Sequence, residues 1–187
     1  MTLVKEYSHL LSKSECSTII ELAKKKGVST AGTVGEEIDG YRTADSCWLD
    51  FDDDNIILWL QDYISKVTNL PIENQEHPHI VRYGIGGEYK EHHDWFDIND
   101  EDNWDQIGES GNRTHSFLVY LNDDFEGGET EFINLKQTIK PEIGKGLMWT
   151  NMKDSECLED SLHAGLPVTE GFKWILIVWV RENKFII

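Results

Sequence analysis

The pattern of apolar residues changes at His77, and this change constrains the fold more than any other feature of the sequence. Before His77 the apolar residues follow helical spacing, and after it they form short or alternating runs separated by Gly, Asn and Asp. The runs predict strands at His79–Tyr83, Glu88–Asp94, Thr114–Leu121, Thr130–Ile133, Gly146–Thr150 and Lys173–Arg181. Closely spaced strands after two helices are typical of an antiparallel sandwich or jelly roll. We therefore expect a mainly β fold with flanking helices, a double-stranded β-helix (jelly roll) with the N-terminal helices packed outside.

Two helices are expected in the N-terminal part of the chain. Ser12 and Glu15 fit a capping box, and a basic run followed by glycine marks the end of the first helix. Asp53 or Asp54 can cap a second helix, whose apolar residues repeat on one face until Pro71 ends it. Each helix should therefore pack one apolar face against the core.

The length of 187 residues is sufficient for one domain with a substantial core, and we expect a single domain over residues 1–187. Residues 1–76 would form a helical support region and residues 77–187 the jelly-roll core. Residues 28–46, rich in glycine, read as a loop or irregular hairpin, and residues 46–51 as a short strand. No internal repeat is apparent.

The charge and cysteine content exclude several classes of function. A net charge of −18, from 17 basic and 35 acidic residues, disfavours binding to nucleic acid or to an anionic membrane. The three cysteines are widely spaced and lack a Cys-x-x-Cys pattern, which argues against a disulfide framework and a thiolate zinc site. Without a signal peptide or an 18-residue apolar span, we expect a soluble, cytoplasmic protein.

A candidate metal site begins with His92 and Asp94, which lie two residues apart in a predicted strand. Successive strand side chains point to opposite faces, so these two project together while His93 points away. By context, His163 is the best candidate for a third ligand. Two imidazoles and one carboxylate make the facial triad of non-haem Fe(II) oxygenases. A lone His-x-Asp pair is a weak signal, because most such pairs are simply solvated.

Lys173 opens the apolar run from Trp174 to Val180. A cation at the start of a buried strand is costly unless an anion meets it, and an acidic cosubstrate would be such an anion. In a strand, Trp179 lies on the same face as Lys173. The alternative is a strand-end lysine whose amine reaches solvent.

Five motifs occur in order and at compatible spacing: Tyr83-x-x-Gly86-x-x-Tyr89-x-x-His92-x-Asp94, Arg113-Thr114-x-x-x-Leu118-x-Tyr120-Leu121-Asn122, Gly127-Gly128-Glu129-Thr130-x-Phe132, Pro141-x-x-Gly144 and His163-x-Gly165-x-Pro167-Val168-x-x-Gly171-x-Lys173-Trp174. Over about residues 77–181 the set resembles the catalytic domain of prolyl 4-hydroxylases, which are Fe(II)- and 2-oxoglutarate-dependent dioxygenases. Five ordered motifs are far more specific than any one of them.

The resemblance implies that His92, Asp94 and His163 bind Fe(II) and act as the catalytic centre. It implies that Lys173 pairs with the distal carboxylate of 2-oxoglutarate. O₂ would be the second cosubstrate, and ascorbate the expected reductant. Asp94 favours hydroxylation, because related halogenases have a small residue at this position.

Three further residues are expected beside the cosubstrate. The Tyr83 and Ser116 hydroxyls fall where members of the family hydrogen-bond 2-oxoglutarate. Trp179 would join them from the strand face that it shares with Lys173. His115 lies next to Ser116 in the sequence, but its parity places it on the other face of its strand, so we exclude it as a ligand.

The activity implied by the resemblance is hydroxylation of a prolyl residue in a peptide or protein, with release of succinate and CO₂. The acidic segment 97–112 follows the predicted ligand strand, and long loops on rigid barrels often act as lids or collars. This segment, with Trp104, and the segment 28–46, with Arg42, are the expected walls of a substrate groove.

Several alternatives remain open at this stage. Within the same class, the substrate could be free proline, another amino acid or a small metabolite. A non-catalytic jelly-roll module that binds metal or 2-oxoglutarate is a second reading, against which an intact triad argues. A nucleic-acid demethylase is a third, disfavoured by Lys173 and the net charge.

The chain lacks the secretory signal, peptide-binding domain and disulfide-like cysteines of the animal collagen enzymes, and Glu91 stands where family members often carry Pro. The oligomeric state is left undetermined.

Overall fold

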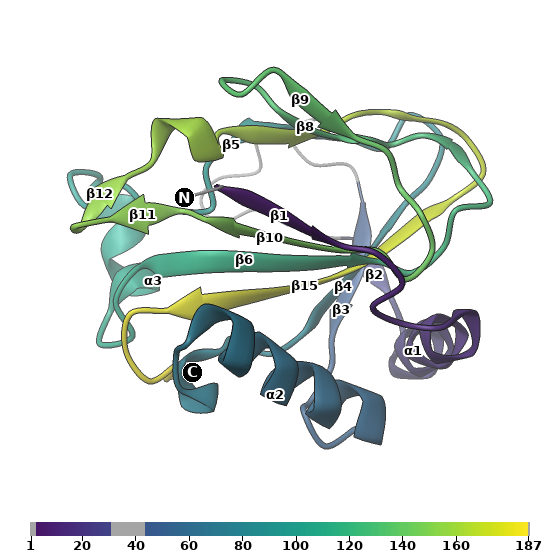
Figure 1. Cartoon of the computed structure of the whole chain (residues 1–187), viewed down its shortest axis with the longest axis horizontal. Helices are drawn as coiled ribbons and strands as arrows, with labels where there is room; N and C mark the ends of the chain where they lie inside the picture. The colour runs from purple at the N-terminus through teal and green to yellow at the C-terminus, as the bar shows by residue number, and fades with distance from the viewer. Residues whose placement is uncertain (1–2, 31–43, 187) are drawn as a thin grey trace.

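The computed structural model describes residues 3–30 and 44–186, with only the backbone of residues 29–30. Within these residues the chain is mainly β with few helices (Figure 1). None of the described helices is long and apolar enough to cross a membrane. Arg42, predicted to contact substrate, lies outside the described residues.

A seven-stranded antiparallel sheet forms the middle layer of the molecule (Figure 1). Its order is β1 (Val4–Tyr7), β10 (Gly146–Thr150), β6 (Arg113–Tyr120), β15 (Lys173–Arg181), β4 (His79–Tyr83), β3 (Asp45–Trp48) and β2 (Ser29–Thr30). The longest strands, β6 and β15, lie side by side near its centre, where both of their faces are covered.

A smaller four-stranded sheet faces the large one. Its order is β5 (Tyr89–His92), β13 (His163–Gly165), β8 (Thr130–Phe132) and β9 (Gln137–Ile139). Two-stranded ribbons accompany it: β7 (Glu126–Gly127) with β14 (Val168–Glu170), and β11 (Met152–Lys153) with β12 (Glu156–Cys157). Figure 1 shows the small sheet and the long helices on opposite sides of the large sheet.

The helices begin where the sequence predicts. Helix α1 (Lys13–Lys26) has a capping box, in which Ser12 accepts from the backbone of Glu15 while the Glu15 carboxylate accepts from the Ser12 backbone. Helix α2 (Asn55–Thr68) is capped by Asp54, which accepts from Ile56 N. The remaining helical segments are single turns: η1 (Ile72–Asn74), η2 (Glu101–Asn103), α3 (Trp104–Ile107) and η3 (Glu159–Ser161).

Strand β15 divides the core into two parts by its alternation. Its even-numbered residues, among them Leu176 and Val178, pack with α1 and α2. Its odd-numbered residues, Ile175 and Ile177, pack toward the small sheet. All nine residues of β15 are buried. Burying each large apolar side chain contributes roughly 1.5–3 kcal/mol, so β15 stabilises the packing of the large sheet against both the helices and the small sheet.

Two sequence expectations need correction. Strand β5 ends at His92 instead of Asp94, so Asp94 lies in a bend beyond the strand. The N-terminal region also supplies β1, β2 and β3 to the large sheet, and of these β1 was not expected from the sequence. The acidic segment 97–112 contains two short helical turns, η2 and α3. The division into a single domain stays a prediction.

Candidate active site

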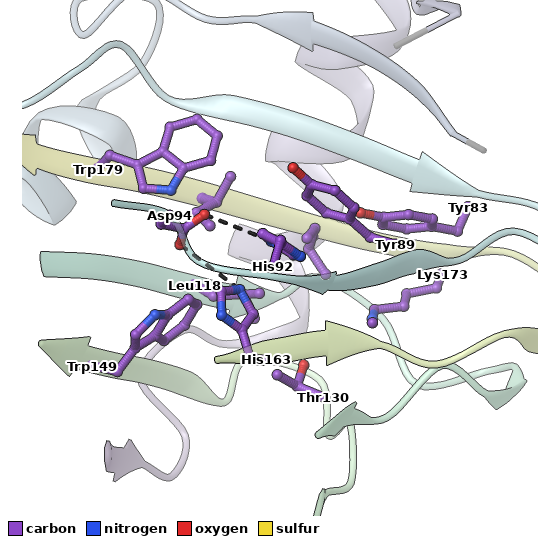
Figure 2. Close-up of a pocket in the computed structure, with 13 residues that line it drawn as sticks. Tyr83, Tyr89, His92, Asp94, Leu118, Thr130, Trp149, His163, Lys173 and Trp179 are labelled. Carbon is purple, nitrogen blue, oxygen red and sulfur yellow. Dashed lines mark ion pairs between the residues drawn. The ribbon is translucent and has the colours of Figure 1, made fainter. Parts of the chain in front are cut away.

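Three side chains converge between the two sheets. His92 ends β5 and His163 begins β13, and these antiparallel strands place the two residues opposite each other. Their ring centroids lie 4.2 Å apart. Asp94 joins them from the bend, with its oxygens 3.7 Å from His92 Nε2 and 3.8 Å from His163 Nε2 (Figure 2). One potential ligand atom from each residue lies within 4.8 Å of the others, and no other such group occurs among the described residues.

The hydrogen bonds of the two imidazoles leave their inner nitrogens available. His92 Nδ1 lies 2.6 Å from the Lys90 carbonyl oxygen, and His163 Nδ1 lies 2.9 Å from the Ser161 carbonyl oxygen. A carbonyl can only accept, so each Nδ1 carries the proton and each Nε2 keeps a lone pair directed into the site. Metal-binding histidines are commonly oriented in this way.

Asp94 provides the negative charge of the site. Burial tends to raise the pKa of this carboxyl, but His163, His92, Arg113 and the Ser116 hydrogen bond together outweigh it and hold the pKa below its usual value. Asp94 is therefore an ionised ligand at neutral pH. Two imidazoles and one carboxylate on one side of a cavity fit Fe(II) and leave coordination positions open for other ligands.

Lys173 lies in the same pocket, on one side of the three ligands (Figure 2). It is only 3% exposed, and its Nζ donates to the Gly128 carbonyl oxygen at 2.7 Å. Burial lowers the pKa of Lys173 to about 8, partly offset by Glu129. No carboxylate among residues 3–30 and 44–186 lies within ion-pair distance of its amine. The pocket therefore offers a buried cation that needs an anion.

Other pocket residues surround Lys173 and the triad. Tyr83 and Tyr120 place their rings 5.3 and 5.7 Å from Lys173 Nζ. The Thr130 hydroxyl shares a 2.6 Å hydrogen bond with the Tyr120 hydroxyl. Leu118, Ile175 and Ile177 make the wall contributed by the large sheet. The cavity volume is about 40 Å³, counted as space for the centre of a water molecule, so the pocket is a narrow slot.

The remaining predicted residues fall into three situations. Trp179 lines the pocket, but Figure 2 places it on the far side of the triad from Lys173. The Ser116 hydroxyl donates to Asp94 in the described structure, and its expected contact with 2-oxoglutarate stays a prediction. Trp104 is 56% exposed and donates its indole N–H to the Ile98 carbonyl, and it does not line this pocket.

Sequence reasoning missed three residues that line the pocket. Thr130 stands in one of the five motifs, but the sequence gives no sign that its hydroxyl faces the site. Tyr89 stacks on His92 with ring centroids 3.5 Å apart, a contact that strand parity does not predict for residues three apart. Trp149 lay in a predicted strand, and only the three-dimensional register shows that it faces the site.

Two facing β-sheets hold a His/Asp/His triad and a buried lysine in one slot. This combination is typical of the Fe(II)/2-oxoglutarate oxygenase class. The family model described as "2OG-Fe(II) oxygenase superfamily" matches residues 78–181. The chain belongs to this superfamily and, within it, to the prolyl 4-hydroxylase family. It is a 2-oxoglutarate-dependent dioxygenase that uses Fe(II), with His92, Asp94 and His163 as its facial triad.

Individual relatives support this assignment. A protein of Acanthamoeba polyphaga mimivirus with a provisional prolyl 4-hydroxylase name is 32% identical, covering 95% of this chain and 74% of that protein. The Caenorhabditis elegans prolyl 4-hydroxylase subunit alpha-1 is also 32% identical over 96% of this chain, which spans only 33% of that subunit. The viral collagen prolyl hydroxylase of Paramecium Bursaria Chlorella virus-1, solved with 2-oxoglutarate, superposes with a TM-score of 0.80 at 28% identity, covering 96% of both chains.

Proposed function

We propose that this protein hydroxylates prolyl residues in a peptide or protein, and that its two facing sheets form a double-stranded β-helix (jelly roll). The observation that carries the proposal is the joint placement of the triad and Lys173 in one narrow slot. The names of its relatives, one of them a collagen prolyl hydroxylase, support a proline-containing polypeptide as the substrate.

The protein supplies three ligands and a shielded site for the reaction. Bound Fe(II) supplies the oxidative chemistry, in which 2-oxoglutarate and O₂ yield succinate, CO₂ and a hydroxylated substrate. Asp94 contributes the single negative charge among the ligands, and each imidazole places Nδ1 against a backbone carbonyl, which leaves Nε2 to face the site. Ascorbate is the reductant that we expect to restore the iron after unproductive turnovers.

Lys173 anchors the distal carboxylate of 2-oxoglutarate. Its amine is buried without a carboxylate partner, and an ion pair in such surroundings is strong because little water competes for it. The Tyr83 and Thr130 hydroxyls lie in the same pocket and are suited to hydrogen-bond the same carboxylate. We assign Thr130 to this contact and Ser116 to Asp94.

The side of the triad away from Lys173 receives the substrate. Trp179 and Trp149 line the pocket, and neither indole N–H has a hydrogen-bond partner among the described residues. The two rings line the pocket as flat apolar surfaces suited to a pyrrolidine ring. Trp179 is thus proposed as a substrate neighbour, and Arg42 and Trp104 as contacts farther along a peptide groove.

The test measures succinate release and substrate oxygenation together. Anaerobically loaded Fe(II) protein is given 2-oxoglutarate, O₂ and proline-containing peptides, and the peptide products are analysed by mass spectrometry and amino-acid analysis for hydroxyproline. We expect a peptide that gains one oxygen atom at proline while succinate forms in equal amount. Free L-proline serves as the matched control. Oxygenation of the free amino acid with no reaction of any peptide would replace this proposal by a small-molecule hydroxylase.

A further inference from the structure

Ser116 lies behind the pocket and contacts one of its lining residues, Asp94. It is fully buried near the middle of β6, and its register partners are Trp149 in β10 and Trp179 in β15. These three neighbours form a row across adjacent strands, with the smallest side chain in the middle. The two indoles, 0% and 5% exposed, flank the serine, so its hydroxyl makes its hydrogen bonds with little access to water.

A short hydrogen-bond relay runs through this hydroxyl. Ser116 Oγ donates to Asp94 Oδ2 at 2.5 Å, and Asn151 Nδ2 donates to Ser116 Oγ at 2.9 Å. An amide nitrogen can only donate, so the serine oxygen accepts from Asn151 and its own proton is directed to the carboxylate. The amide of Asn151 thereby sets the direction of the whole relay.

Backbone hydrogen bonds hold the Asn151 end of the relay in place. Asn151 is fully buried, its backbone N–H donates to the Thr114 carbonyl at 2.8 Å, and its carbonyl accepts from Leu158 N at 2.9 Å. Asp94, by contrast, lies beyond the end of β5 and has no strand pairing of its own. The orientation of its carboxylate must therefore come from side-chain contacts, and Ser116 donates the one hydrogen bond to it found among the described residues.

We propose that Ser116 and Asn151 are positioning residues for the iron ligand Asp94. By holding Oδ2 of Asp94, they would leave Oδ1 available to ligate bound Fe(II), and the remaining coordination positions would be left for cosubstrate and O₂. This inference rests on the proposed role of Asp94 as an iron ligand.

The experiment measures metal affinity directly. Anaerobic titrations with Fe(II), and with Co(II) as a spectroscopic substitute, are made on the metal-free protein and on Ser116→Ala. We expect the variant to bind either metal about 10- to 100-fold more weakly, the effect typical of a lost partner of a metal ligand. We also expect the visible Co(II) spectrum to change, because a freed Oδ2 alters the coordination of the ion. Unchanged affinity together with an unchanged spectrum would overturn the proposal.

Asn151→Ala provides a second route, because this change leaves Ser116 in place. It should weaken metal binding less than Ser116→Ala does, and it should add nothing further in the Ser116→Ala background, since Asn151 acts only through the serine. Independent, additive losses would overturn the relay. This variant also keeps the proposal testable if Ser116→Ala fails to fold.

Two controls separate the outcomes. Thr114→Val removes a hydroxyl on the same strand that donates to the Val180 carbonyl, so it should leave metal affinity and the Co(II) spectrum unchanged. Asp94→Ala should abolish tight metal binding. If Asp94→Ala binds metal like the wild type, the iron site itself is wrongly assigned; if only Ser116→Ala does, the relay alone is refuted.

Discussion

Lys173 is the residue at which burial and charge oppose each other most directly. Its amine is almost completely covered, yet no carboxylate of the described residues lies within ion-pair distance of it. Burial lowers the pKa of Lys173 to about 8, close enough to neutrality for the charge to depend on conditions. The buried charge thus destabilises the protein when 2-oxoglutarate is absent and favours binding of this dianion.

The first prediction concerns the pH dependence of 2-oxoglutarate binding. Below a pH of about 8 the amine of the free protein is protonated and attracts the dianion; above it, binding must first recover a proton. The dissociation constant should therefore rise about tenfold for each pH unit above that pKa. Calorimetric titration of the Fe(II) protein at a series of pH values checks this. Lys173→Arg, which stays charged throughout, should show no such rise.

The second prediction separates stability from function in Lys173→Met. Removing the charge should weaken 2-oxoglutarate binding at least about a hundredfold, because the distal carboxylate loses its partner. The ligand-free variant should nevertheless be about 1–4 kcal/mol more stable near neutral pH, since a buried unpaired charge has gone. Chemical denaturation monitored by circular dichroism measures this gain.

The pH dependence of that gain has a definite sign. The pKa of Lys173 is lower in the folded protein than its ordinary value of 10.5, so the unfolded chain binds more protons between about pH 8 and that value. The wild type must therefore gain stability relative to Lys173→Met as pH rises through this window, and the difference should close. A difference that is constant with pH would contradict the assigned pKa.

Elements that are long and strongly patterned could be predicted from the sequence, whereas most of the very short strands could not, with β8 as an exception because it falls within a predicted strand. Strands β4, β10 and β15 have the predicted bounds, because each is a run of apolar residues with clear turn signals around it. Strands β7, β13 and β14 have two or three residues, too few for any periodicity to appear. These strands form by pairing with segments that are distant in the sequence, and local residue patterns do not predict such pairing.

The same distinction applies to the site. His92, Asp94, His163 and Lys173 could be identified because each stands in a recognisable motif. The partner of Ser116 could not, because it depends on where the bend after β5 places Asp94. Strand alternation correctly predicted that His92 and Asp94 lie together. The reason was incomplete, because β5 ends at His92 and Asp94 lies in the bend that follows.

A matched pair in β15 tests the two-sided role of this strand. Leu176 is fully buried on the helix side, so Leu176→Ala should cost about 2–5 kcal/mol of stability and leave 2-oxoglutarate affinity unchanged. Ile177 is its neighbour on the pocket side, so Ile177→Ala should weaken cosubstrate binding as well as stability. Denaturation and calorimetry on both variants check the expectation. Equal effects of the two changes on binding would refute the division of the core.

At the scale of the whole molecule, a buried ionic cluster joins segments that are far apart in the sequence. Glu76 accepts from Arg113 Nε at 2.7 Å and from Arg181 Nε at 2.6 Å. Arg181 also donates to the carbonyls of Gln106 and Gly111, and the Arg113 guanidinium lies 3.7 Å from the centre of the Trp179 ring. One carboxylate thus connects β6, β15 and the acidic segment near the pocket.

The fourth prediction follows from this cluster. Glu76→Ala leaves two guanidinium groups buried without their shared anion, which should cost about 3–5 kcal/mol of stability. Because Arg113 stacks on Trp179, we also expect weaker binding of the peptide substrate, with little change in metal affinity. Denaturation, peptide KM and metal titration test the three parts. The surface pair formed by Lys24 and Glu21 is the control, and Glu21→Ala should change stability by less than about 1 kcal/mol.

The placement of the ligands also bears on how the site opens. His92 and His163 belong to the four-stranded sheet, whereas Lys173 stands on the seven-stranded sheet. A cosubstrate that reaches both the iron and Lys173 therefore fastens one layer to the other. Ligands that bind only the native state stabilise it, so backbone amides of β5 and β13 should exchange their hydrogens more slowly once 2-oxoglutarate is bound. The cosubstrate would thus link the two sheets, and the protection of these amides should fall when 2-oxoglutarate is replaced by its shorter product, succinate.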